Sequence, residues 1–283
     1  MKLLQRKIDS ILKEWKKNEN RLPLIVKGAR QVGKTASILQ FAHSNYKNVV
    51  AINFVLQPKY KAIFEEGYEV DDIIRNLTLI DPSLKIEPTN TLIFFDEMQD
   101  CPACATSLKA FKIDGRYDVI CSGSLMGINY QEIESNSVGY KEDYTMHSMD
   151  FEEFLWAKGY DSSFINSLYD KMTTVTPLTR IEMDILEKIF REYMTIGGMP
   201  AVVNQFVSNK NFSGTLKMQQ QLLLDYEEDI TKYAHGLDKG RIKNVYDHIT
   251  VFLGQDNKKF QISKIARGAR NREYVGTIEW LRN

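Results

Sequence analysis

Residues 22–35 read Leu22-Pro-Leu-Ile-Val-Lys-Gly-Ala-Arg-Gln-Val-Gly-Lys-Thr35. The first half is an apolar run opened by a proline, which is typical of a strand buried in a parallel sheet. The second half matches the pattern G-x-x-x-x-G-K-[ST] at every fixed position. Apolar residues at helical spacing follow from Ile38 onward. The order strand, glycine-rich turn, helix is the context that a phosphate-binding loop requires, and we give that name to residues 28–35.

Every residue of the phosphate-binding loop is predicted to contact a nucleotide. Its glycines let the backbone curl until successive N–H groups point toward phosphate oxygens, and the following helix adds its positive end. Lys34 is predicted to stabilise negative charge on the γ-phosphate, and the Thr35 hydroxyl to bind Mg²⁺. The predicted nucleotide-binding residues are Gly28, Ala29, Arg30, Gln31, Val32, Gly33, Lys34 and Thr35.

Two acidic residues, Asp96 and Glu97, follow the apolar run of residues 91–95. Because the carboxyl ends of parallel strands line a ligand crevice, Asp96 is predicted to hold Mg²⁺. Glu97 is predicted to act as the general base that activates the attacking water. The 62-residue separation of Lys34 from Asp96 leaves room for a strand and its crossovers. The alternative is that these acids are plain helix caps.

A further polar stretch, Ser122-Gly-Ser124, follows the apolar strand predicted over residues 118–121. A hydroxyl at this edge of the sheet can contact the γ-phosphate or orient the water. A serine before glycine is also a common turn residue. We favour Ser122 over Ser124 for the catalytic role.

The chain predicts an α/β fold with a parallel sheet flanked by helices, as in P-loop nucleoside triphosphatases. Its strands alternate with helical segments up to about residue 150, where the pattern becomes mostly helical. An amphipathic helix is expected over residues 3–15. Asp150 and Glu153 fit a capping box at the start of a later helix. The predicted strands are residues 22–27, 49–54, 91–95 and 118–121, with 140–146 as a candidate fifth.

The bulk composition is that of an ordinary globular protein with no net charge. Lys and Arg together number 37, as do Asp and Glu. This balance argues against a protein that binds nucleic acid over most of its surface. No apolar run approaches the roughly 20 residues needed to span a bilayer, so no membrane association is expected. The N-terminal residues lack the features of a signal peptide, and three cysteines do not make a disulfide framework. A cytoplasmic location is therefore expected.

With these motifs, the sequence resembles a large group of prokaryotic AAA-type ATPases that carry a C-terminal domain of unknown function. Two unusual stretches strengthen the resemblance, Met149-Asp-Phe-Glu-Glu-Phe-Leu155 and Gly197-Gly-Met-Pro200. Asp96-Glu-Met-Gln99 and Ser122-Gly-Ser124 also match, and the similarity runs over nearly the whole chain. Val138-Gly-Tyr-Lys141 lies where many relatives have an arginine after the glycine, so no arginine finger is assigned there.

The resemblance implies an AAA-like core, a helical segment and a winged-helix-like unit, followed by a further domain. Because the chain stops at Trp280-Leu-Arg-Asn283, we expect that last domain to be largely missing and the winged-helix-like unit to be partial. The predicted boundaries are 1–150 for the ATPase domain with its N-terminal helix, 151–238 for a helical linker or lid, and 239–283 for the truncated winged-helix-like unit.

The predicted activity is Mg²⁺-dependent hydrolysis of the β–γ bond of ATP, because no guanine-reading N-K-x-D motif is present. Two alternatives stay open. One is a slow nucleotide switch that acts through a protein partner. The other is an ATP-regulated DNA-binding protein, because residues 239–283 carry ten Lys and Arg against four Asp and Glu, and residues 262–281 fit a helix-turn-helix. The sequence leaves the oligomeric state open.

Overall fold

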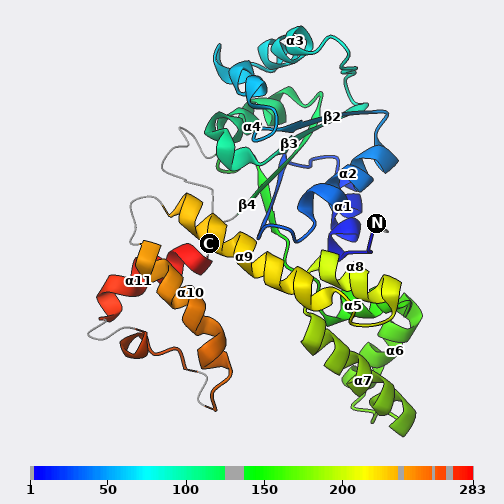
Figure 1. Cartoon of the computed structure of the whole chain (residues 1–283). Helices are drawn as coiled ribbons and strands as arrows, with labels where there is room; N and C mark the ends of the chain where they lie inside the picture. The colour runs from blue at the N-terminus through cyan, green and yellow to red at the C-terminus, as the bar shows by residue number, and fades with distance from the viewer. Residues whose placement is uncertain (1–2, 125–136, 235–238, 257–258, 266–269, 283) are drawn as a thin grey trace. The chain divides into compact units, whose positions relative to one another are not determined.

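The computed structural model describes residues 3–124, 137–234, 239–256, 259–265 and 270–282 (Figure 1). The chain divides into two units, Met1–Thr215 and Leu216–Asn283, which are described separately. In the described ranges, no helix combines the length and apolar character needed to cross a membrane.

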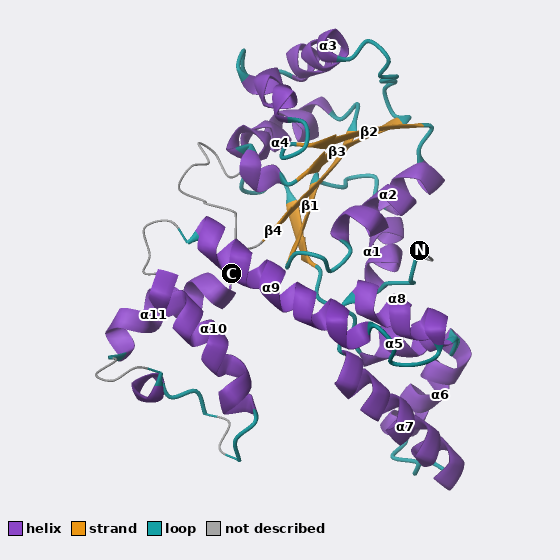
Figure 2. Cartoon of the chain, viewed as in Figure 1, coloured by secondary structure: helices purple, strands orange, loops and turns teal. Residues whose placement is uncertain are grey.

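Among the described residues, a five-stranded sheet lies at the centre of the first unit, with strand order β2-β3-β4-β1-β5. Figure 2 draws its strands in orange. Every pairing in the sheet is parallel, which confirms the predicted α/β fold class. β4 extends beyond its predicted end at residue 121, because Val26, Lys27 and Gly28 pair with residues 122–124. The strands are β1 (Leu24–Gly28), β2 (Asn48–Asn53), β3 (Thr91–Asp96), β4 (Asp118–Ser124) and β5 (Glu142–Thr145).

Helices cover both faces of this sheet, and each face has its own buried apolar cluster (Figure 1). The first cluster joins the sheet to α1 (Lys7–Lys17) and α2 (Lys34–Asn45). The second joins it to the 3-10 helix η1 (Pro58–Phe64), α3 (Val70–Ile80) and α4 (Pro102–Asp114). Successive residues of the central strands alternate between the two clusters, as the side-chain direction in a strand requires. A strand buried on both faces explains the continuous apolar runs in the sequence.

The helix predicted over residues 3–15 begins at Lys7. Arg6 has extended backbone, and its N–H donates to the Asp9 carboxylate at 2.9 Å, which starts the helix one residue later. Its buried face is made by Ile8, Leu12 and Trp15 at helical spacing.

In the described residues of the first unit, the sheet is followed by α5 (Phe151–Lys158), α6 (Ser162–Thr173), α7 (Arg180–Ile196) and α8 (Pro200–Asn209). α5 begins with the predicted capping box. The Glu153 N–H donates to Asp150 Oδ1 at 2.9 Å, and the Asp150 N–H donates to Glu153 Oε2 at 3.2 Å. These two reciprocal hydrogen bonds fix where α5 starts.

The second unit is helical in its described residues. Its elements are α9 (Thr215–Tyr233), α10 (Lys239–Leu253), the 3-10 helix η5 (Ile262–Lys264) and α11 (Asn271–Arg282). The first helix of the predicted helix-turn-helix is thus a single 3-10 turn, closed by the Ile265 N–H to Ile262 carbonyl bond. Residues 266–269 lie outside the described residues. The winged-helix-like assignment and the boundaries at 150 and 238 stay predictions.

Candidate nucleotide site

The phosphate-binding loop begins where β1 ends, and its backbone leaves no room for a side chain at Gly28. A Cβ there would lie 2.1 Å from the Met146 carbonyl oxygen. The Met146 N–H donates to the Lys27 carbonyl at 2.7 Å, so the two backbones cannot move apart freely. Gln31 and Gly33 have φ values of +63° and +100°, in the left-handed region. These turns curl the loop before α2 begins at Lys34.

The Lys34 side chain folds back over this loop. Its ammonium group donates to the carbonyl oxygens of Gly28 at 2.9 Å and Ala29 at 2.8 Å. The residue is only 8% exposed. Burial lowers the pKa of Lys34, and the nearby carboxylates of Glu97 and Asp96 oppose that change. The ammonium group is therefore held at the start of the loop, with both acids close enough to influence it.

Three polar side chains converge on the carboxylate of Asp96, the last residue of β3. Thr35 Oγ1 lies 3.2 and 3.1 Å from its two oxygens, and the Ser122 hydroxyl donates to Oδ1. The Asn53 amide donates to Oδ2 at 3.0 Å. The structure thus brings together Thr35, Asp96 and Ser122, which the sequence predicted as site residues. Asn53 was not predicted. It ends β2 and pairs in register with Asp96.

Glu97 lies directly after β3, in the left-handed region with φ of +55°. Its carboxylate accepts a hydrogen bond from the Gln99 amide. The Gln99 side-chain oxygen accepts from the Ser124 N–H at 3.3 Å. Gln99 therefore links the predicted base to the end of β4. It appeared in the sequence only as part of a matching stretch, with no role assigned.

Thr35 and Asp96 are a suitable pair for Mg²⁺. Both offer oxygen atoms, and the hydroxyl and carboxylate are already within 3.2 Å of each other. In the part of the chain that the structure describes, no group of three or more His, Cys, Asp or Glu residues could form a closed metal cage. Mg²⁺ commonly binds one or two protein oxygens and takes the rest from water and phosphates. The donor set fits that pattern.

Comparison with protein families agrees with this architecture. Residues 20–155 match the family model of an AAA domain, and residues 187–283 match that of a domain of unknown function, DUF8612. The N-terminal part of the chain therefore matches an AAA domain and its C-terminal part a domain of unknown function, in agreement with the resemblance, although we expected that C-terminal domain to be largely missing. An AAA domain supports an ATPase-type, nucleotide-binding function.

Individual relatives are distant. An uncharacterized protein of Haemophilus influenzae is 21% identical over 179 residues, a match that covers 63% of this chain and 40% of that protein. Among solved structures, AMPPCP-bound DnaA from Aquifex aeolicus is 12% identical with a TM-score of 0.41, covering 96% of this chain and 85% of that one. Drosophila ORC bound to DNA is also 12% identical, with a TM-score of 0.39 and coverage of 96% and 84%.

Proposed function

We propose that this chain is a Mg²⁺-dependent ATPase that cleaves the β–γ bond of ATP to give ADP and phosphate. The observation that supports this most is the convergence of Thr35, Asn53 and Ser122 on Asp96, beside the phosphate-binding loop. A plain helix cap would not need three side-chain donors from three different elements. The AAA family match over residues 20–155 is consistent with this activity.

The proposed roles follow from where each side chain lies. Backbone N–H groups of the loop bind the phosphates, and Lys34 stabilises negative charge on the γ-phosphate. Thr35 and Asp96 would hold Mg²⁺, which would neutralise part of the negative charge on the phosphates. Glu97 accepts the proton of the attacking water as the water oxygen bonds to the γ-phosphorus and the bond to the bridging oxygen breaks. Ser122 orients Asp96 from the neighbouring strand.

A slow nucleotide switch is the second candidate, and one contact favours it. The Glu97 carboxylate accepts a hydrogen bond from Gln99, which restrains its orientation and so its freedom to turn toward an attacking water molecule. A site in which Glu97 stays bound to Gln99 would hold ATP with little turnover.

Phosphate release at saturating Mg²⁺ and ATP separates these two functions. For an ATPase, Glu97→Gln should lower turnover about 10²- to 10⁴-fold, the usual contribution of a general base, while ATP binding is kept. The control is Glu142→Gln, which removes the same charge at the exposed first residue of β5 and should leave turnover unchanged. Wild-type turnover no faster than that of Glu97→Gln would contradict the ATPase proposal and favour the switch.

A further inference from the structure

Arg6 is a buried cation outside the set of residues that the motifs single out. Its side chain is 5% exposed, although arginine is rarely buried without a partner. Nη1 donates to the Val32 carbonyl oxygen at 2.6 Å, and Nη2 donates to the His147 carbonyl oxygen at 2.7 Å. Nε lies 3.0 Å from Glu153 Oε1. The guanidinium group thus connects the phosphate-binding loop with two segments more than 100 residues away.

The contact with Val32 has a consequence for the next residue. The Val32 carbonyl and the Gly33 N–H belong to one planar trans peptide, so they point in opposite directions. With the carbonyl held toward Arg6, the Gly33 N–H faces away from Arg6. A Cβ on Gly33 would lie 3.5 Å from Arg6 Nη1, so the guanidinium group also lies against the backbone at this point. Inward-facing N–H groups are what a phosphate-binding loop requires.

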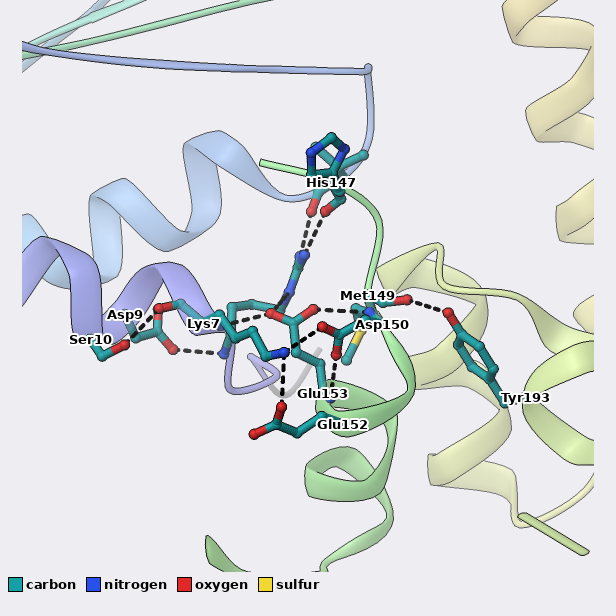
Figure 3. A network of polar contacts seen from close by, with 11 residues as sticks. Lys7, Asp9, Ser10, His147, Met149, Asp150, Glu152, Glu153 and Tyr193 are labelled. Atoms are coloured by element: carbon teal, nitrogen blue, oxygen red, sulfur yellow. Dashed lines mark hydrogen bonds and ion pairs between the residues drawn. The ribbon is translucent and has the colours of Figure 1, made fainter. Parts of the chain in front are cut away.

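Glu153 in turn fixes the position of Arg6. Its carboxylate is 6% exposed and accepts the Lys7 N–H at 2.7 Å, besides the Asp150 N–H of the capping box. Figure 3 shows Glu153 between Lys7 and Asp150, with His147 nearby. Arg6 therefore has a fixed counter-charge and two carbonyl acceptors, which leaves its guanidinium group few other orientations. Arg6 Nε makes this ion pair with Glu153 without a hydrogen bond, while its two other nitrogens donate to carbonyl oxygens. Removing one partner of a buried ion pair leaves an uncompensated charge and is strongly disruptive.

We propose that Arg6 is a positioning residue for the nucleotide site. It holds the peptide between Val32 and Gly33 so that the Gly33 N–H is presented to the phosphates, and Glu153 keeps Arg6 in place. That the Gly33 N–H binds phosphate rests on the proposed function, whereas the restraint that Arg6 places on the loop does not.

Hydrogen exchange measured by mass spectrometry on the full chain without nucleotide tests the restraint directly. Arg6→Ala should speed exchange of peptides covering residues 28–36 about 10-fold, as expected for a loop that opens locally. The matched control is Arg21→Ala, which breaks an arginine–carboxylate pair with Asp118 in the same unit without touching the loop. It should leave exchange in the loop unchanged.

Steady-state kinetics then test the link to ATP. Arg6→Ala should raise KM about 10-fold or more while kcat at saturation stays within about 3-fold, the pattern of lost ground-state and transition-state binding in equal measure. Arg6→Lys should fall between wild type and Arg6→Ala, because one ammonium group can keep the pair with Glu153 but does not reproduce the fork of donors. If Arg6→Ala does not fold, Arg6→Lys and Glu153→Gln replace it in both measurements.

The outcomes are distinguishable. Faster exchange in the loop together with a raised KM supports the positioning role. If loop exchange in the Arg6 variants matches that in Arg21→Ala, or if KM is unchanged despite a fall in Tm, Arg6 is structural only and the inference is overturned. If wild type binds no nucleotide, the proposed function fails, and the exchange measurement still decides whether Arg6 restrains the loop.

Discussion

The backbone of Gly198 lies against that of Met149 with no room for a side chain, and replacement of Gly198 by alanine should strongly destabilise the first unit. A Cβ at Gly198 would lie 2.0 Å from the Met149 carbonyl oxygen and 3.0 Å from its carbon. The Met149 N–H also donates to the Gly198 carbonyl at 2.7 Å. This contact joins the two stretches, residues 149–155 and 197–200, that the sequence showed only to be unusual. Figure 3 shows the Met149 carbonyl oxygen accepting a hydrogen bond from the Tyr193 hydroxyl.

The size of the effect follows from the clash. Ordinary Cβ contacts begin near 3.4 Å, so the two backbones must separate by about 1.4 Å. Such overpacking costs about 1–3 kcal/mol. The separation also breaks the Met149 to Gly198 bond and disturbs the 2.9 Å bond from Tyr193 Oη to the Met149 carbonyl, each contributing about 1 kcal/mol. A total of about 3–5 kcal/mol corresponds to a Tm lower by roughly 10 °C for a unit of this size.

Thermal unfolding followed by circular dichroism measures this effect, with Gly115→Ala as the control. Gly115 follows the end of α4 with φ of +71°, and a Cβ added there would meet no other atom within 4 Å, so only the left-handed backbone is penalised. That penalty is about 1–2 kcal/mol, or a few degrees in Tm. If Gly198→Ala lowers Tm no more than Gly115→Ala does, the claim that residues 149 and 198 are in close backbone contact is refuted.

Two further predictions concern single polar side chains. Asn53→Ala removes an amide donor 3.0 Å from Asp96 and should raise the Mg²⁺ concentration for half-maximal turnover about 10-fold, whereas Asn48→Ala, at the other end of β2, should not. Burial alone would raise the pKa of Asp150, but hydrogen bonds from Lys7 and from backbone N–H groups hold it below 3.8. Because its folded pKa is depressed, Asp150 stabilises the fold above pH 3.8, and this contribution is lost as the pH falls further. Asp150→Asn, which can still cap α5, should therefore lower the free energy of unfolding at pH 7 but less below pH 3.8; urea titrations showing a pH-independent difference would contradict this.

The positions of the loop over residues 28–35 and of the acids beside it could be predicted because local sequence encodes them, whereas their roles stay predictions. A buried strand, a glycine-rich turn and a helix must follow one another for the loop to form, and residues 22–35 show all three. Asp96 and Ser122 each directly follow an apolar run of the sequence. In a parallel sheet the carboxyl ends of the strands lie along one edge, so the sequence pattern is sufficient to predict that these residues lie close together.

Asn53 and Gln99 could not be assigned in the same way. Asn53 sits in an apolar run with no motif, and its role depends on the register that pairs it with Asp96. The Gln99 amide donates to the Glu97 carboxylate, and Glu97 has a left-handed backbone conformation. Glutamate is not a residue type that favours this conformation, so the sequence does not predict it.

Arg6 was missed for a different reason. If residues 3–15 form one amphipathic helix, an arginine in it is predicted to lie on the solvent-exposed face. Because the helix begins at Lys7, Arg6 instead precedes it with extended backbone, and its side chain is buried. Its partners, Val32, His147 and Glu153, are 26 to 147 residues away, so only the tertiary structure brings them together.

The most direct test of the nucleotide site is equilibrium binding of ATP with Mg²⁺ to wild type and to Lys34→Ala, measured by isothermal titration calorimetry. Circular dichroism on both proteins establishes that each is folded. The account predicts binding by wild type and an affinity about 10- to 100-fold weaker in Lys34→Ala, the effect of losing a charged hydrogen-bond donor to phosphate. A folded wild type that binds no ATP, or equal affinity in the two proteins, would contradict it.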